Sequence, residues 1–541
     1  MRTLNHELTF QAIFMYKLVD PNTLKNWLHD GAEIALFDVR EQGQYGESHL
    51  FYGIPVPYSR LELDAPRLAP RTSVRLVVYD EDQSVALRAA ARLTEIGYSD
   101  VHVLAGGTRA WQAAGYPVFA GVHVPSKTFG ELVEHARHTP SVSAPVLFDM
   151  LRRGDNVLVL DGRPFSEYQK MTIPGSICCP NGELSYRVHD MIDSPDTTIV
   201  VNCAGRTRSI IGAQTLINLG LPNPVLALEN GTQGWYLEDF ELEHGSRRRY
   251  PDNVSDAAKE RARIASASVA EQYAVATVDA DEVATWLAEG ASSVFLCDVR
   301  TPDEFAAGSL PRAQHAPGGQ LIQATDLYVG VRHARIVVFD DDGIRAPVVA
   351  SWLKQLGHNA VVLKDGLRSG LSMPAPAGIT LPALKTVSVA QVAAGLQTST
   401  MRVMDVRHSM SYRKAHIAGA SWGIRSRLPA LETFAGTCER VVLISDEDGV
   451  AALVAAEWRA AGSAPQVDLL QLEGGMKAWT AAQLPIESTP TQPADADCID
   501  YLFFVHDRHD GNKAAARQYL QWETGLLAQL DQRELDGFKL D

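Results

Sequence analysis

Cysteine is scarce in this chain, and its scarcity limits what the protein can be. Only six of the 541 residues are cysteines, and no two of them form a C-x-x-C pair. This pattern argues against a disulfide framework and against a cysteine-based zinc site, so we expect no metal. We expect a cytoplasmic protein, in which a free thiol stays available for chemistry.

Positive charge and long hydrophobic runs are also lacking. The chain has 49 Lys and Arg against 65 Asp and Glu, a formal net charge of −16. This balance argues against general nucleic-acid binding, so any anion site has to be local. No run is long enough to span a membrane, and the first residues lack the apolar core of a signal peptide. We therefore expect neither nucleic-acid nor membrane partners.

What the chain does have is a fourfold repeat. An apolar run ending in Asp-x-Arg occurs four times: "ALFDVR", "LVLDGR", "FLCDVR" and "RVMDVR". A second apolar run follows each one and stops at a loop, which begins with Asp80, Cys203, Asp340 and Asp446 in turn. The spacing between the two anchors is the same in the first three copies and one residue shorter in the fourth. Such regularity indicates four copies of one structural unit.

Each unit alternates short apolar runs with amphipathic segments. Continuous Val/Ile/Leu runs are typical of strands covered on both faces of a parallel sheet, and the segments between them have the spacing of helices. The fold class is therefore α/β, with four tandem domains that each have a central, mostly parallel sheet flanked by helices. The predicted divisions are 10–120, 123–245, a helical linker at 246–271, 272–375, 384–490 and a C-terminal extension at 495–541.

The extension is expected to begin with a strand and turn at 501–511. An amphipathic helix is then predicted over 512–532, with an apolar side that packs on the domains.

The second unit alone has a cysteine at the loop. A helix is predicted to begin just after Cys203, so its free N–H groups and its dipole would favour negative charge there. Arg206 and Arg208 lie in the same loop, "CAGRTR". A thiolate at this place should have a depressed pKa and react as a nucleophile without a general base. Because the other copies carry aspartate, we expect a solvent-accessible loop, and we expect the other three units to be inactive.

The motif order resembles the rhodanese superfamily of sulfurtransferases. The Asp-x-Arg strand end, "EYQKMTIPGS", the cysteine loop and "NGTQGW" follow one another in the second unit. "KAHIAGAS" in the fourth unit is similar to another pattern of the family. The resemblance extends to about residue 490 as four tandem rhodanese-like domains.

The resemblance implies a double-displacement sulfurtransferase without a cofactor. Cys203 would be the nucleophile that becomes a persulfide, in a cradle formed by Ala204, Gly205, Arg206, Thr207 and Arg208. Arg206 and Arg208 would bind the oxyanion of a small anionic donor such as thiosulfate, and Arg187 is a further basic contact. The acceptor would be cyanide, a small thiol or a protein thiol. The sequence leaves open whether the protein forms a homo-oligomer.

Two other functions stay open. Phosphatases and arsenate reductases of the same architecture use a C-x5-R loop, one residue longer than the C-x4-R formed here by Arg208. The second alternative is a non-catalytic scaffold of four domains. A sulfur relay through Cys178 and Cys179 is a lesser alternative to their packing in the core.

Overall fold

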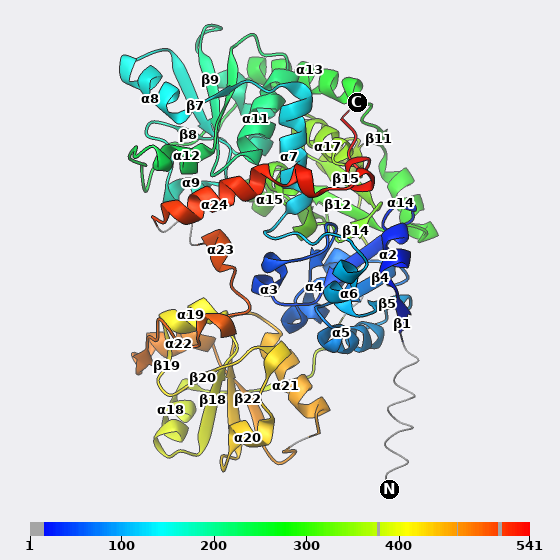
Figure 1. Cartoon of the computed structure of the whole chain (residues 1–541), viewed down its shortest axis with the longest axis vertical. Helices are drawn as coiled ribbons and strands as arrows, with labels where there is room; N and C mark the ends of the chain where they lie inside the picture. Colours follow the sequence, from blue (N-terminus) through cyan, green and yellow to red (C-terminus); the bar gives the residue numbers. More distant parts are fainter. Residues whose placement is uncertain (1–15, 376–378, 463, 507–510, 541) are drawn as a thin grey trace.

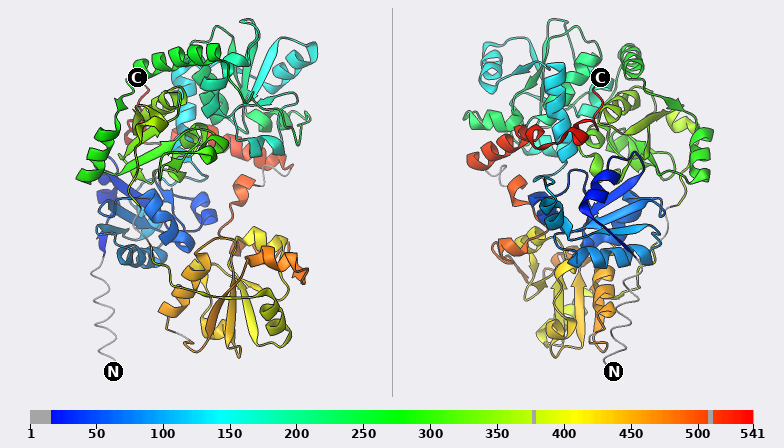
Figure 2. Two further views of the ribbon diagram at one scale, coloured as in Figure 1. Left: turned by 180° about the vertical axis from the view of Figure 1, so that it is seen from behind. Right: turned by 45° about the vertical axis from the view of Figure 1, so that its right-hand side comes forward.

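The computed structural model describes residues 16–375, 379–462, 464–506 and 511–540. It contains four similar α/β units and a C-terminal segment. The first three units lie together, and the fourth lies at one end of the molecule, below the first (Figure 1). Both views in Figure 2 show the same separation. The predicted α/β class with four tandem units is confirmed.

Each unit has a central sheet whose strands are parallel within the unit. The second unit shows the order β6-β10-β9-β7-β8, and the third and fourth repeat it with their own strands. The strands of the second unit are β6 (Ser141–Val142), β7 (Val157–Asp161), β8 (Ile177–Cys178), β9 (Thr198–Asn202) and β10 (Val225–Leu228). The helices are α7 (Val124–Arg137), α8 (Ala144–Arg153), α9 (Phe165–Lys170), α10 (Asn181–Arg187), α11 (Thr207–Asn218) and α12 (Gly231–Leu237).

The first and third units are built from the same pattern. The first has β1 (Lys17–Val19), β2 (Ile34–Asp38), β3 (Ile54–Pro55), β4 (Arg75–Tyr79), β5 (Val101–Leu104), α2 (Pro21–Trp27), α3 (Gln42–Glu47), α4 (Leu61–Leu68), α5 (Ser84–Glu95) and α6 (Gly107–Ala113). The third has β11 (Thr277–Val278), β12 (Val294–Asp298), β13 (Gln314–His315), β15 (Arg335–Phe339), β16 (Asn359–Leu363), α14 (Ala280–Glu289), α15 (Pro302–Ala307), α16 (Gly318–Gln323) and α17 (Arg345–Gln355). The preceding helix α13 (Asp256–Gln272) occupies the predicted helical linker.

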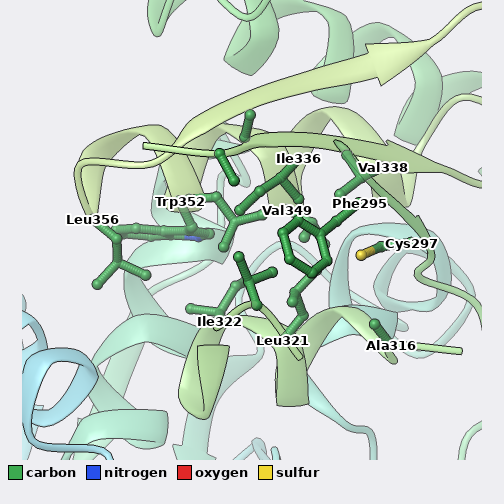
Figure 3. Close-up of a cluster of buried hydrophobic side chains, with 14 of the residues drawn as sticks. Phe295, Cys297, Ala316, Leu321, Ile322, Ile336, Val338, Val349, Trp352 and Leu356 are labelled. Carbon is green, nitrogen blue, oxygen red and sulfur yellow. The ribbon is translucent and has the colours of Figure 1, made fainter. Parts of the chain in front are cut away.

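One strand crosses between units. β14 (Val331–Arg332) comes from the third unit but pairs antiparallel with β2 of the first, Val331 opposite Ala35. Buried apolar side chains of the first three units also form one continuous cluster. Figure 3 shows the part around Phe295, Cys297 and Trp352. Burial raises the pKa of Cys297 to about 12, so this cysteine is a packing residue.

The fourth unit and the C-terminal segment complete the chain. The unit contains β17 (Lys385–Val387), β18 (Met401–Asp405), β19 (His416–Ile417), β20 (Ser421–Trp422), β21 (Arg440–Ile444), β22 (Asp468–Leu472), β23 (Ile486–Glu487), α18 (Val389–Gln397), α19 (Ser409–Lys414), α20 (Leu431–Ala435), α21 (Val450–Ala460) and α22 (Gly475–Ala481). The segment contains α23 (Phe503–His506), α24 (Lys513–Thr524) and α25 (Gln532–Leu535). It runs from the fourth unit back to the other three, and α24 lies across the second unit (Figure 1).

Part of the prediction for this segment is wrong. The expected strand at 501–511 is the short helix α23, and residues 507–510 of that stretch lie outside the described residues. The following amphipathic helix is present, although it ends at Thr524, before Gly525. Among the described residues, no helix is long and apolar enough to cross a lipid bilayer.

Candidate active site

The candidate site lies at the carboxyl edge of the second sheet, where ligands of open parallel sheets bind. Cys203 follows β9 directly, and α11 begins at Thr207. Helix α12 holds the carbonyls of the loop: the N–H of Thr232 donates to Cys203 O at 2.8 Å, and that of Gln233 to Ala204 O at 3.1 Å. Gly231, at φ +54°, allows this approach, because a Cβ there would lie 2.3 Å from Cys203 O.

Unlike its carbonyls, the backbone N–H groups at the start of the loop have no hydrogen-bond partner in the described part of the chain. Among the described residues, the backbone N–H groups of Ala204, Gly205 and Arg206 donate no hydrogen bond. These N–H groups lie in the loop between Cys203 and the start of α11 at Thr207. Such an arrangement favours an anion.

The third unit shows what such a loop can hold. The carboxylate of Asp340, which follows β15 as Cys203 follows β9, accepts hydrogen bonds from Gly343 N at 2.7 Å, Ile344 N at 2.9 Å and Arg345 N at 2.6 Å. In the first unit, Asp80 accepts from Val85 N at 2.6 Å and Ala86 N at 3.1 Å. These loops bind a negative group supplied by their own side chain.

The expected solvent access is wrong for the first residue of the loop, although Glu81 and Asp82 are exposed in the first unit. The exposed fraction is 2% for Cys203, 2% for Asp80 and 3% for Asp340. The aspartates tolerate burial because backbone N–H groups replace the water that would otherwise solvate them. Cys203 itself has a polar neighbour, since the Ser209 hydroxyl lies 3.1 Å from its sulfur.

The residue predicted to match Cys203 in the fourth unit is wrong by one position. In the sheets, Asp161 pairs with Asn202 and Asp405 pairs with Ile444. The residue that matches Cys203 is therefore Ser445, rather than the predicted Asp446. Asp446 is half-exposed and lies 3.5 Å from Arg407. The fourth unit still has no thiol at the position.

Arg206 is held by helix α7. Its guanidinium donates to Glu131 at 2.8 and 3.0 Å, and it pairs with Glu134. Burial opposes the charge of Arg206, but these carboxylates raise its pKa above the usual value. Figure 1 shows α7 beside α11, which places acidic side chains next to the loop.

Arg208 is held by helix α9. It donates to the two oxygens of Glu167 at 2.9 and 2.8 Å. The third unit has the same pair: Arg345 donates to Glu304 at 2.8 and 2.9 Å. Because the pair recurs in a unit without a cysteine, it stabilises the loop in both.

Arg187, the further predicted contact, is tied to another part of the unit. It pairs with Glu183 at 2.9 Å and donates to the carbonyls of Pro251 and Asp252. Its guanidinium also packs on the ring of Tyr250. Among the described residues, Arg187 makes no hydrogen bond or ion pair with the Cys203 loop.

Sequence reasoning missed the residues that other elements bring to the loop. Glu523 of α24 accepts from the Thr207 hydroxyl at 2.9 Å, and Lys127 of α7 lies 3.5 Å from the same carboxylate. Gln233 is 4% exposed, and neither polar atom of its side chain has a hydrogen-bond partner among the described residues. The amide lies 4.0 Å from the place of a Cβ on Gly205. Only the "GTQGW" motif points to Gln233 in the sequence.

The Asp-x-Arg pair fixes the strand next to the loop. Arg163 binds Asp161 through two hydrogen bonds of 2.9 and 2.7 Å and donates to Met171 O. Asn202, the residue before Cys203, also donates to Asp161 at 2.9 Å. Equivalent pairs occur in the other units: Arg40–Asp38, Arg300–Asp298 and Arg407–Asp405. The motif is structural.

Cys178 and Cys179 are buried in the same unit. Burial raises the pKa of Cys178 to about 12 and that of Cys179 well above its usual range. Neither is poised as a thiolate, which supports the packing alternative over a sulfur relay.

Comparisons with known proteins agree with this architecture. The model of the rhodanese-like domain matches residues 20–114, 143–238, 279–372 and 388–482. A solved structure described as a thiosulfate sulfurtransferase from Pseudomonas aeruginosa is 40% identical, covers 97% of this chain and 99% of its own, and has a TM-score of 0.90. A rhodanese-related protein from Thermoplasma volcanium is 28% identical over 19% of this chain and 97% of its own, with a TM-score of 0.17. No curated protein matched the chain.

Proposed function

This chain belongs to the rhodanese family, and from that premise we propose that it is a sulfurtransferase whose nucleophile is Cys203. The observation that carries the proposal is the loop itself. The loop begins with a thiol and contains N–H groups that have no partner among the described residues, and the corresponding N–H groups of the third unit bind a carboxylate. Backbone N–H groups and the N-terminus of a helix stabilise a negatively charged sulfur.

The proposed reaction has two displacements. The Cys203 thiolate attacks the outer sulfur of a donor such as thiosulfate, the S–S bond breaks, and its electron pair leaves with sulfite. The resulting persulfide would carry its negative charge next to the N–H groups of Arg206, Thr207 and Arg208, which correspond to the groups that donate to Asp340. A thiol or cyanide then attacks the outer sulfur and regenerates the Cys203 thiolate.

A surface pocket beside α12 supports access to the loop. Its lining includes Met171, Thr232, Gln233, Phe240 and His244. Gln233 belongs to both the pocket and the surroundings of the loop, and its unpartnered amide can donate to or accept from a small polar molecule. We propose that donor and acceptor approach from this side.

The three other units are proposed to be inactive. Asp80 and Asp340 fill their own loops, and Ser445 lacks the nucleophilic sulfur of Cys203. β14 joins the third unit to the first, and the core that both share with the second unit supports it.

Mass spectrometry of the full chain tests the proposal. After exposure to thiosulfate, we expect Cys203 to gain one sulfur atom, about 32 Da, as a persulfide. Cys203→Ala should gain none and release no sulfite. Cys438→Ala is the matched control. Cys438 is the most exposed cysteine among the described residues, and its removal should not change the sulfur uptake. Equal labelling of wild type and Cys203→Ala would overturn the assignment.

A further inference from the structure

A cavity lies where the first unit, the third unit and the C-terminal segment meet. It has room for about five water molecules, and most of its wall is apolar. Phe51 comes from the first unit, Leu356 from the third and Phe538 from the segment. The crossing strand β14 brings Arg332 to the same cavity, and His333 follows it.

Arg332 has no counter-charge in this cavity. Its guanidinium packs on the ring of Tyr52, 3.6 Å from the ring centre, and forms no ion pair among the described residues. Its Nε is shielded from solvent and has no hydrogen-bond partner there. Glu534, the carboxylate that acts on it from a distance, already pairs with Lys25. Burial therefore lowers the pKa of Arg332, whereas carboxylates raise the pKa of Arg345.

A guanidinium in these surroundings lowers the stability of the fold. A desolvated charge without a partner is unfavourable, and an apolar side chain of similar volume would be more stable there. A bound carboxylate would supply the missing charge, and its two oxygens match the donors of a guanidinium. His333 adds a further polar atom, because its Nε2 is also shielded from solvent and has no hydrogen-bond partner among the described residues.

One acidic residue lines the cavity, at a different place. Asp326 lies 2.7 Å from Nδ1 of His123, and its other oxygen has no partner in the described part of the chain. Asp326 is not among the groups whose charge acts on Arg332. No other Asp or Glu of the described residues lines the cavity. An anion is therefore favoured at the Arg332 end alone, next to the apolar wall.

A surface pocket lies next to the cavity and shares His333, Gly357 and His358 with it. The charged side chains of this pocket are Lys354 and Lys539, and no Asp or Glu lines it among the described residues. Each lysine donates to a backbone carbonyl. In a chain with a net charge of −16, this pocket is a local positive surface that attracts anions toward the cavity.

We propose that this cavity binds a small organic monoanion, with its carboxylate on Arg332 and an apolar body, such as an aromatic ring, against the apolar wall. The site is separate from the Cys203 loop, so the proposal does not depend on sulfur transfer. An inorganic oxyanion such as phosphate fits less well, because the apolar wall cannot replace the water that surrounds all its oxygens.

Benzoate, a carboxylate on an apolar ring, is the probe, and isothermal titration calorimetry of the full chain measures its affinity. Benzamide has nearly the same shape without the charge. It should bind about tenfold more weakly, because the charge-assisted pair with the guanidinium is lost. Phosphate should also bind more weakly than benzoate. Equal affinities for benzoate and benzamide, or tighter binding of phosphate, would overturn the proposal.

Two variants locate the site. Arg332→Met should weaken benzoate binding by about tenfold or more. Arg335→Met is the matched control, because Arg335 also packs on an aromatic ring, that of Trp286, but does not line the cavity. It should bind benzoate like the wild type. Unchanged binding in Arg332→Met would overturn the proposal.

The melting temperatures without ligand separate binding from folding. No carboxylate loses a partner in Arg332→Met, so we expect this variant to melt no lower than Arg335→Met. A clearly lower melting temperature would show that the fold itself needs the charge of Arg332, and it would also overturn the proposal.

Discussion

The loops that begin at Cys203 in the second unit and at Asp340 in the third have the same position in the sheet and the same arginine–glutamate pair. They differ in their first residue, which is a thiol in one and a carboxylate in the other. Each follows a central strand of its sheet, and each has an arginine that pairs with a glutamate of a preceding helix, Arg208 with Glu167 and Arg345 with Glu304. In the third unit, Asp340 occupies the N–H groups of the loop. In the second, Cys203 leaves them without a partner among the described residues. The comparison separates the arginine–glutamate pairs, which stabilise both loops, from Cys203, which would react.

The comparison also changes the role of the loop arginines. From the sequence, two guanidinium groups next to a cysteine suggested binding of the donor oxyanion. The structure places both in ion pairs, and one of the pairs recurs where no thiol exists. The N–H groups of the backbone are then the main candidates for anion binding, and the arginines shape the loop.

The largest expected effect comes from giving the second unit the side chain of the third. Cys203→Asp should abolish sulfur uptake, because a carboxylate cannot serve as the sulfur nucleophile. The carboxylate should accept hydrogen bonds from the loop, so we expect a melting temperature no lower than that of Cys203→Ala. Calorimetry and thiocyanate formation measure the two effects. A clearly lower melting temperature would show that the two loops are not equivalent.

A smaller effect is expected from the arginines. Arg345 is fully buried and pairs with Glu304 and, at 3.0 Å, with Glu183. Arg345→Met removes the arginine partner of Glu304 and leaves Glu183 with Arg187 alone, so it should lower the free energy of unfolding by about 3 kcal/mol. Arg208→Met should lower it by about 1 kcal/mol, because Glu167 is 37% exposed and water can solvate it. Urea unfolding of both variants measures the difference. Equal losses would contradict the structural comparison.

The smallest expected effect is a pH dependence of the third unit. Burial would raise the pKa of Glu304, but the hydrogen bonds from Arg345 prevail and lower it to about 2. A lowered folded pKa gives stability above the unfolded value near 4.5, and this stability is lost as the pH falls toward 2. Because Glu304 is partly solvated, we expect about 1 kcal/mol. Unfolding from pH 6 to pH 3 should be less pH-dependent in Glu304→Gln, and an unchanged slope would contradict this.

The strands were predictable for a local reason. Continuous apolar runs such as Ile199 to Val201 end at a polar residue, and this pattern is visible without any long-range information. The site of Cys203 at the start of a helix follows from the same local pattern. The burial of Asp80 and Asp340 was not predictable, because it depends on N–H groups that turn toward the carboxylate only in the folded loop.

The order of residues by itself determined four repeated α/β units and one loop with a cysteine. Only the tertiary structure decided what surrounds that cysteine. The partners of the loop, Glu131 and Glu523, lie 75 and 316 positions away from Arg206 and Thr207 in the chain. β14 likewise pairs with a strand of another unit. Periodicity reports which side of an element is apolar, whereas these contacts depend on which elements pack together.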